Sequence, residues 1–511
     1  MLKPKEQGLA NLAAIEALQR LDCGEKDPSL FEALKQFNGW GSIWQVFRED
    51  ANGWAKDCQK QLKILLSSEE LSAARASILN AHYTDPEIIK ATWRVVQGLG
   101  FTGGSALEPA CGAGLFIRHA PTQLPIQWTG VELDPIPAKI AQYLNPTATI
   151  YNQGFETVVM PDDLFDLAIS NVPFGSYKVH EPRYNKLGVY IHSHFIAKMT
   201  DLVRPGGLIV VISSTGTLDT DQNEQFREWL SRKASLVHAV RLPNNTFKAM
   251  AHTEVTTDLM FFQKVRETEL PVWVNSKVTK ETEQLGKNLK LNAYYIQNRQ
   301  RLLGKLCLAT LYGGETLGLE STGLNIPESI IKSAAWVPPC YKSGPHNTLK
   351  AIPPELQYLK PYQFVQHNGR IYQRVGSTLE QIDNHKDQII DLMELSEILE
   401  YLIAIQGTAS DEKLTIEQQT LSKKYDSLIR KYGYINSKNN ETVFGDDPRY
   451  PGLQALETTS LKKADIFTKR TSKIYQVPDS FQSPEEALIH CLNVKGRVDL
   501  DWIKEHCFPT E

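Results

Sequence analysis

The residues best suited to chemistry lie where a short apolar segment ends in a turn. From Phe165 onward, Leu167 and Ile169 alternate with small residues, and this pattern predicts a buried strand. The turn that follows begins with the catalytic candidates Asn171, Val172, Pro173 and Phe174. An amide at the carboxyl end of a strand can accept hydrogen bonds, and the aromatic ring after it can stack on a planar ligand. By itself the tetrapeptide also fits an ordinary strand that ends in an Asn-Pro turn.

This run resembles the N-P-P-[YF] motif of amino-methyltransferases, which modify exocyclic amines, adenine N6 above all. The resemblance implies that the side-chain oxygen of Asn171 and a backbone carbonyl accept the two protons of a poorly nucleophilic aromatic amine. Phe174 would stack on a base flipped out of its helix. Val172 stands where the family usually has its first proline. That position acts through its carbonyl, which any residue supplies, so the departure costs backbone rigidity rather than chemistry.

A glycine turn upstream suggests a cofactor site. The apolar run from Ala106 leads into E-P-x-x-G-x-G, and a helix is expected to begin near Leu115. Glycines allow the backbone to approach a ligand closely, and a helix N-terminus favours negative charge. The leading acid suits a cofactor with an amino group and a sulfonium better than one with a pyrophosphate. The run resembles the first S-adenosylmethionine motif and gives the cofactor-binding candidates Glu108, Pro109, Ala110, Cys111, Gly112 and Gly114. Cys111 is expected to be a small buried residue rather than a nucleophile.

Two later segments extend this site. An acid at the end of a second strand, about 20 residues past a glycine turn, is placed to bind ribose hydroxyls. Glu132 is assigned that role beside Leu133, with Asp134 capping the next helix. After a third strand, Gly154 stands where many relatives have an aspartate that binds the cofactor's adenine amine, so this contact is open and Phe155 is an alternative stacking partner.

Tyr83-Thr84-Asp85-Pro86 precedes the glycine turn, with Asp85 as the expected N-cap of a helix. A lone Y-T-x-P predicts little more than a helix start. The methyltransferase family keeps such a motif at this place, where it lines the cofactor pocket, so Tyr83 and Thr84 join the cofactor-binding candidates. Asn171 is counted among them as well.

Alternating strands and helices predict an open α/β sheet, which the resemblance makes a Rossmann-like S-adenosylmethionine-dependent methyltransferase sheet. We divide the chain into a helical N-terminal cap (1–80), the methyltransferase domain (81–266), a target-recognition region (267–385) and a helical and basic C-terminal region (386–511). The last two are expected to be an α+β recognition part, with a hairpin around Asn368-Gly369 and a long helical pair over 386–432. The tryptophans of the cap, including Trp40 and Trp44, are expected to be core residues.

Composition excludes several classes. With 511 residues, 41% of them hydrophobic and 22% charged, the chain is expected to form two or more soluble domains. No apolar run is long enough to span a membrane, and seven scattered cysteines argue against a zinc site or disulfide framework, so we expect a cytoplasmic protein without metal. The net charge of −4 means that nucleic-acid binding would require a local basic patch.

One such patch lies after the sheet. Residues 284–314 contain no acid and interleave five cations with Tyr294 and Tyr295. A solvated basic helix face is an equally good interpretation, but these cations are the DNA-binding candidates: Lys287, Lys290, Arg299, Arg301 and Lys305. A weaker cluster runs from Lys462 to Lys473.

The motif order resembles the adenine-specific DNA methylases, and the tail around Lys463–Arg470 and Gly496–Leu500 resembles large methylase–helicase proteins of mobile elements and phages. The chain has no G-x-x-x-x-G-K-[ST], so a helicase or restriction subunit is expected to act in trans or to be absent. We therefore expect a site-specific DNA adenine-N6 methyltransferase that acts on double-stranded DNA in a restriction-modification, phage-defence or mobile-element system. Alternatives are a protein-glutamine or RNA methyltransferase and a catalytically idle DNA-binding specificity subunit. Cytosine C5 methylation is a poor option, because the only Pro-Cys pair lies outside the sheet.

Overall fold

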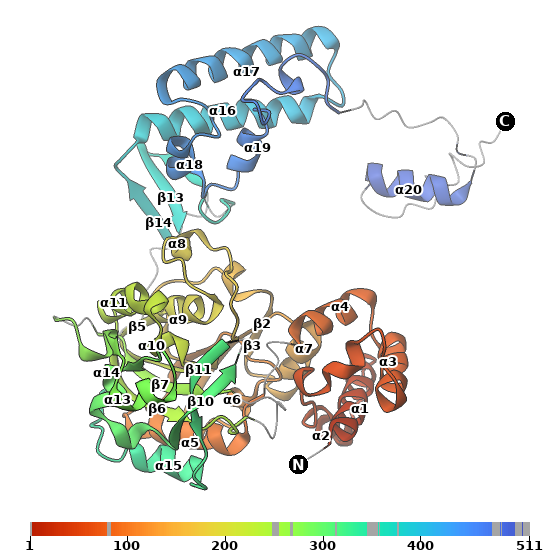
Figure 1. Cartoon of the computed structure of the whole chain (residues 1–511). Helices are drawn as coiled ribbons and strands as arrows, with labels where there is room; N and C mark the ends of the chain where they lie inside the picture. The colour runs from red at the N-terminus through yellow and green to blue at the C-terminus, as the bar shows by residue number, and fades with distance from the viewer. Residues whose placement is uncertain are drawn as a thin grey trace. The chain divides into compact units, whose positions relative to one another are not determined.

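A computed structural model gives the fold (Figure 1). It describes all residues except 1–2, 79–82, 248–254, 266–268, 312–313, 345–355, 357, 376–377, 473–480, 482, 496–502 and 504–511. The tail motif Gly496–Leu500 and Lys473 therefore lie outside the described residues. The chain forms two compact units, residues 1–352 with 376–378, and residues 353–375 with 379–511.

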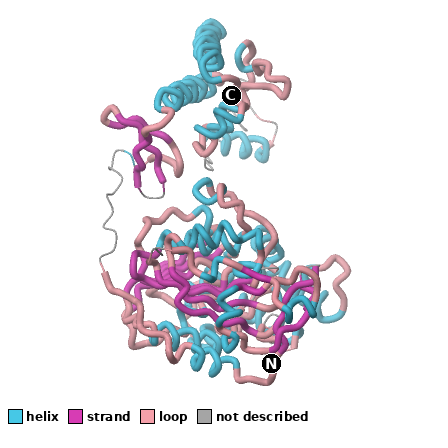
Figure 2. Tube along the Cα trace, turned by 60° about the vertical axis from the view of Figure 1, so that its left-hand side comes forward, coloured by secondary structure: helices cyan, strands magenta, loops and turns pink. Residues whose placement is uncertain are grey.

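The first unit is built on a seven-stranded sheet with the order β3-β2-β1-β4-β5-β7-β6. Figure 2 shows its strands in magenta with helices on both sides. Its first five strands are parallel neighbours, and β7 runs antiparallel to both β5 and β6. The strands are β1 (Gly104–Glu108), β2 (Ile126–Glu132), β3 (Thr149–Asn152), β4 (Phe165–Asn171), β5 (Val203–Ser214), β6 (Ser235–Leu242) and β7 (Thr257–Gln263). The structure thus confirms the predicted α/β class with a mainly parallel sheet.

Helices cover both faces of this sheet, as a buried parallel sheet requires. Alternate residues of β4 enter different cores: Leu167 and Ile169 pack with α5, and Ala168 packs with α9. The covering helices are α5 (Pro86–Gly98), α7 (Pro135–Leu144), α9 (Ile191–Leu202) and α11 (Glu224–Ser231). Asp85 caps α5 and Asp134 caps α7, as predicted. The helix expected after the glycine turn, α6 (Leu115–Arg118), is only four residues long.

The N-terminal residues form a helical cap on the same unit. It consists of α1 (Pro4–Asp22), α2 (Pro28–Leu34), η1 (Gly41–Phe47), α3 (Gly53–Leu65) and α4 (Ser68–Ser77). Its apolar core continues onto the rest of the unit through Ile136 and Ile140 of α7, a helix that covers the sheet. Trp40 is fully buried there, whereas Trp44 is 44% exposed and is not the core residue that the sequence suggested.

Residues 272–333, of which 312–313 are not described, follow the sheet. They form η4 (Val272–Val274), β8 (Ser276–Lys277), α13 (Lys280–Leu285), β9 (Leu291–Asn292), α14 (Ala293–Gln297), η5 (Arg299–Arg301), β10 (Lys305–Leu311), β11 (Gly314–Glu320) and α15 (Ile326–Ser333). Of these, η5 and α15 contact β6, and α15 packs mainly on α5. Arg241 of β6, fully buried, pairs with Asp219 at 2.7 Å and Asp258 at 2.8 Å, and its guanidinium lies over the Tyr295 ring. Such a network costs much to break, because each remaining charge would be left buried without its partner.

The second unit has its own core. A three-stranded sheet of β12 (Phe364–His367), β13 (Arg370–Val375) and β14 (Thr378–Ile382) precedes the long helices α16 (Lys386–Ile405) and α17 (Asp411–Tyr432). The predicted hairpin is confirmed, with Asn368 and Gly369 both at positive φ in the turn between β12 and β13. The helices α18 (Lys438–Phe444), α19 (Tyr450–Gln454), η7 (Asp465–Phe467) and α20 (Pro484–Lys495) follow. Within the described residues, no helix has the length and apolar character needed to cross a bilayer.

Candidate functional site

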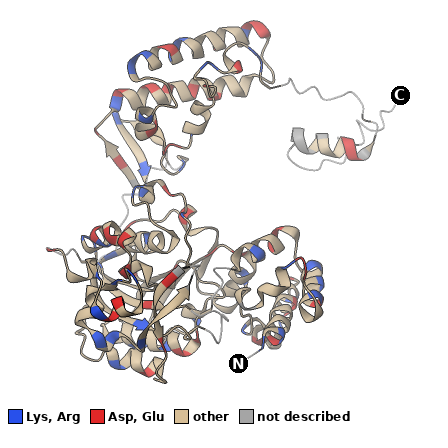
Figure 3. Cartoon of the chain, viewed as in Figure 1, with Lys and Arg blue, Asp and Glu red and all other residues tan. Residues whose placement is uncertain are grey.

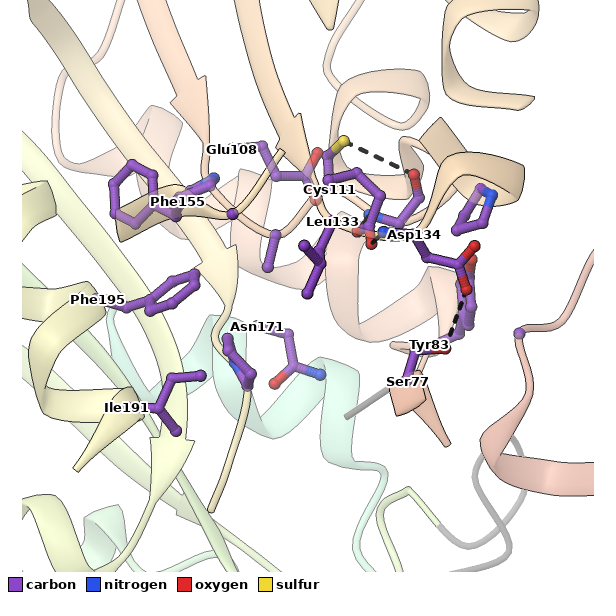
Figure 4. A pocket seen from close by; sticks show the side chains of 18 of the residues that line it. Ser77, Tyr83, Glu108, Cys111, Leu133, Asp134, Phe155, Asn171, Ile191 and Phe195 are labelled. Carbon is purple, nitrogen blue, oxygen red and sulfur yellow. Dashed lines mark hydrogen bonds between the residues drawn. The ribbon is translucent and has the colours of Figure 1, made fainter. Parts of the chain in front are cut away.

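A cavity of about 550 Å³ opens at the carboxyl ends of β1, β2 and β4 (Figure 4). The end of each of these strands contributes a polar residue: Glu108 of β1, Glu132 of β2 and Asn171 of β4. The cavity lies in the size range of sites that bind small molecules and cofactors. It brings together twelve of the predicted cofactor residues: Tyr83, Thr84, Glu108, Pro109, Ala110, Cys111, Gly112, Glu132, Leu133, Gly154, Phe155 and Asn171.

The glycine turn between β1 and α6 needs its glycines for geometric reasons. Gly112 has φ +51 and Gly114 has φ +73, a region that side chains with a Cβ rarely adopt. A Cβ on Gly112 would lie 3.2 Å from the Tyr83 hydroxyl, and one on Gly114 would lie 2.5 Å from Nδ2 of Asn145. Gly112 lines the cavity, whereas Gly114, the remaining predicted cofactor residue, lies outside it and provides the close packing behind the turn.

Glu132 joins this turn to the end of β2. Its Oε2 accepts a hydrogen bond from the Gly112 N–H and its Oε1 accepts one from the Asp134 N–H, both at 2.8 Å. Burial raises the pKa of Glu132 to about 7, although both backbone hydrogen bonds favour the ionised form. The carboxylate is held at the cavity wall, where a ligand's donor groups can reach it.

Glu108 is a second buried carboxyl at the cavity. It is 2% exposed, and burial raises its pKa well above the usual range. Its Oε2 has no hydrogen-bond partner among the described residues. A buried polar atom without a partner is costly unless a ligand supplies one, so this oxygen fits a cofactor that carries an amino group.

The Asn171 amide is held in one orientation at the end of β4. Its Nδ2 donates to the Thr84 hydroxyl at 3.1 Å, so the Y-T-x-P segment positions the amide of the N-V-P-F segment. Pro173 also lines the cavity, whereas Phe174 is half-buried, packs against the cores on both faces of the sheet and does not line it. Asn171 and Pro173 are therefore the two catalytic candidates that reach the cavity.

Val172 has a structural reason to differ from proline. Its side chain is 1% exposed in the sheet core, and its N–H donates to the Ile212 carbonyl at 3.2 Å. A proline has no N–H and would lose this bond to β5. The hydrogen bond offsets the rigidity that a proline would have supplied.

Gly154 and Phe155 also line the cavity. A Cβ on Gly154 would overlap the carboxylate of Glu156, a cavity-lining residue that the sequence analysis did not select. The Phe155 ring packs against Phe195 with centroids 5.0 Å apart. Lys198, buried beside it, donates to the Phe155 carbonyl at 2.6 Å and fixes this turn.

The five DNA-binding candidates fall into two groups. Lys290 pairs with Asp221, Arg299 pairs with Glu281, and Arg301 contacts the His238 ring. These partners lie outside the acid-free segment, so its sequence did not reveal them. Lys287 and Lys305 are exposed and have no ion pair within the described part of the chain. Figure 3 shows Lys and Arg mixed with Asp and Glu over the first unit.

The two tyrosines of this segment are not exposed stacking platforms. Tyr295 is fully buried and donates to Asp258 at 2.8 Å, and the Tyr294 hydroxyl accepts from the Ala239 N–H at 3.0 Å. They anchor the segment on β6 and β7. Among the described residues no cluster of His, Cys, Asp and Glu could hold a metal ion.

The strand order, the antiparallel β7 and the glycine turn after β1 form a Rossmann-like sheet of the kind found in class I S-adenosylmethionine-dependent methyltransferases. No family model matches the sequence. The chain is 29% identical over 192 residues to the Defense against restriction protein B of Escherichia phage P1. This alignment covers 36% of this chain and 8% of the phage protein. It is 30% identical over 151 residues to the Type II methyltransferase M.TthHB8I of Thermus thermophilus, covering 26% of this chain and 34% of that one.

Both alignments span much less than two thirds of the relatives' own length. Among solved structures, the type I restriction-modification methyltransferase subunit from Streptococcus thermophilus matches 56% of this chain and 73% of that chain, with 15% identity and a TM-score of 0.32.

The raised pKa of Glu132 predicts a pH-dependent stability. The folded-state pKa of Glu132 is about 7 and its ordinary value is 4.5. The contribution of this carboxyl to the free energy of unfolding is therefore full below pH 4.5 and is lost as the pH rises through 7. The free energy of unfolding of Glu132→Gln minus that of the native protein should therefore be larger at pH 8 than at pH 5, by up to about 3 kcal/mol. Urea unfolding at both pH values measures this difference, with the exposed Glu69→Gln as control. Equal pH dependence in the native protein and Glu132→Gln would contradict the assignment.

Proposed function

We propose that this chain is a DNA adenine-N6 methyltransferase that transfers a methyl group from S-adenosylmethionine to a flipped-out adenine. The observation that carries the proposal is the single cavity in which the S-adenosylmethionine motif of β1 meets Asn171 of β4. The partial relatives point the same way, since one is called a type II methyltransferase and the other a defence against restriction.

The residues present fit this cofactor. Glu108 offers a buried carboxyl oxygen to an amino group, Glu132 offers a carboxylate to ribose hydroxyls, and Gly112 leaves room for close approach. S-Adenosylmethionine, when bound, supplies an electrophilic methyl group on a sulfonium. The Asn171 side-chain oxygen and the Val172 carbonyl would accept hydrogen bonds from the two N–H groups of the amine, which keeps the nitrogen lone pair directed at the methyl group. After the transfer the methylated amine releases one proton to solvent. Preorganised acceptors of this kind act mainly in the transition state.

The departure at position 154 leads to a second assignment. The Glu156 carboxylate occupies the space that a side chain at Gly154 would enter. We therefore assign Glu156 the role of the aspartate that relatives carry at that position, accepting from the cofactor's adenine amine. With this assignment, neither Val172 nor Gly154 is a reason to regard the protein as catalytically idle.

The proposal is tested with labelled S-adenosylmethionine and the full chain, offered double-stranded DNA, RNA and protein separately. We expect label in DNA, and mass spectrometry of its nucleosides should identify N6-methyladenine. Label in RNA or in protein glutamine would replace the substrate class. Binding of the cofactor without methyl transfer to any of the three substrates would favour a specificity subunit. We also propose that a helicase or restriction subunit acts with this chain in trans.

Asn171→Ala separates chemistry from binding. The variant should bind S-adenosylmethionine within about threefold of the native affinity, yet transfer methyl groups about 100-fold more slowly, because it removes an acceptor needed in the transition state. We propose that the Phe174 ring, which lies outside the cavity in the structure, turns toward the flipped base when DNA binds, so Phe174→Ala should instead raise the KM for DNA. Calorimetry and single-turnover rates measure the two effects. Native transfer rates in both variants would refute the N-V-P-F assignment.

The Glu156 assignment predicts a rescue. Glu156→Ala should weaken S-adenosylmethionine binding about tenfold, the loss of one charged hydrogen bond. The double variant Gly154→Asp/Glu156→Ala should restore most of the affinity, because Gly154 has φ −66, which aspartate tolerates, and the blocking carboxylate is gone. Calorimetry measures both, and an adenine analogue without the exocyclic amine serves as the control ligand. An unrescued double variant would count against the assignment.

The DNA surface can be tested with matched charge reversals. Lys287→Glu/Lys305→Glu removes two unpaired cations, so the slope of log affinity against log salt should become shallower by about 2 if both contact phosphates. Binding should weaken about equally for all sequences, because phosphates carry no sequence information. Lys290→Glu/Arg299→Glu, whose cations are already paired with acids, is the control and should change the slope less. Equal slopes in both double variants would place the DNA contacts elsewhere.

A further inference from the structure

The helical cap contributes directly to the cavity. Six cap residues from two separate segments line it: Phe37, Gly39, Trp40, Ala73, Ala76 and Ser77. The first segment lies between α2 and η1, and the second belongs to α4. The remaining walls come from the sheet and the helices behind it. Without the cap, the side of the cavity around Tyr83 and Asp134 would be open to solvent.

Hydrogen bonds connect this wall to the glycine turn. The Trp40 indole N–H donates to Asp134 Oδ2 at 2.8 Å, and the Ser77 hydroxyl donates to the same oxygen at 3.0 Å (Figure 4 shows the Ser77 contact). The Asp134 N–H donates to Glu132, which accepts from Gly112 as well. A continuous chain of hydrogen bonds therefore runs from the cap to the residues that approach the cofactor.

Apolar packing supports the same contact. The Phe37 ring meets Trp40 at 5.3 Å and Tyr83 at 6.1 Å, both edge to face. Tyr83 in turn lies against the backbone of Gly112. Trp40 and Asp134 are both almost fully buried, at 0% and 2% exposure, so their hydrogen bond is shielded from water. A buried hydrogen bond to a carboxylate is stronger than one at the surface.

We propose that the cap is part of the cofactor site: it closes one side of the cavity, and the Trp40–Asp134 hydrogen bond holds it in place. Trp40 is a positioning residue, because it acts on Glu132 and Gly112 through Asp134. Cofactor binding and cap docking are consequently coupled, and each stabilises the other. The inference rests on the proposed cofactor, S-adenosylmethionine.

The steric test places bulk on the cap. Ala76 lines the cavity but is exposed, so Ala76→Trp should leave the fold intact while filling the ligand space. Ser72→Trp adds the same side chain at an exposed position of α4 that does not line the cavity. Calorimetry with S-adenosylmethionine and with its demethylated product should show a loss of tenfold or more for Ala76→Trp, about the loss expected from a blocked subsite, and none for Ser72→Trp.

The second test concerns the hydrogen bond. Trp40→Phe keeps an aromatic ring but removes the N–H, and should weaken cofactor binding about tenfold. Trp44→Phe makes the same change at an exposed tryptophan outside the cavity and should have no effect. In the native protein, the cofactor should slow amide hydrogen exchange in η1 and α4, and this protection should be smaller in Trp40→Phe.

The outcomes distinguish the role of the cap from the proposed function. Native-like affinity in both Ala76→Trp and Trp40→Phe, with the native protein binding normally, would overturn the cap's role and leave the proposed function intact. Failure of the native protein to bind S-adenosylmethionine would overturn both.

Discussion

The site depends on one carboxylate that bridges two backbone segments. Glu132 accepts from the N–H of Gly112 in the turn after β1 and from the N–H of Asp134 before α7. Because it is buried, its charge is unfavourable without those donors, and they fix its position at the cavity wall. The same few residues therefore set the shape of the glycine turn, the start of α7 and the contact with the cap through Asp134. Any ligand that donates to Glu132 binds a group whose orientation is already determined.

Around this bridge, the two departures from the family pattern have local physical explanations. Val172 uses its N–H to bond with Ile212 of β5, which a proline cannot do. At Gly154, the Glu156 carboxylate lies where a Cβ would be, so a side chain there would have to displace it. Neither change removes from the cavity the polar groups that the proposed methylation would use. At each of the two positions, a neighbouring group makes a different interaction. Comparing the motifs residue by residue therefore underestimates how similar the site is to the pattern that the sequence resembles.

The sequence predicted the charged surface less well than it predicted the cavity. The acid-free segment 284–314 has a formal charge of +5, but three of its cations already contact Asp221, Glu281 or His238 from other parts of the chain. Its tyrosines anchor it to the sheet edge, with Tyr295 beside the Arg241 network. Two of the five cations are thus paired with acids in space, and the surface proposed to bind DNA is narrower than the composition suggests.

The sequence by itself determined the α/β class, the strand that begins at Phe165, the apolar run from Ala106 that forms most of β1, and the caps Asp85 and Asp134. These follow from local periodicity and local hydrogen bonding. It also selected most of the residues that line the sheet side of the cavity, since parallel strands present their carboxyl ends at one edge. It did not identify Trp40, Ser77 or Glu156 as cavity residues, nor the acids that neutralise the basic segment. Those contacts join positions far apart in the chain, or depend on which way one side chain turns. Only the tertiary structure decides them, because no local pattern records which surfaces meet when the cap packs onto the sheet.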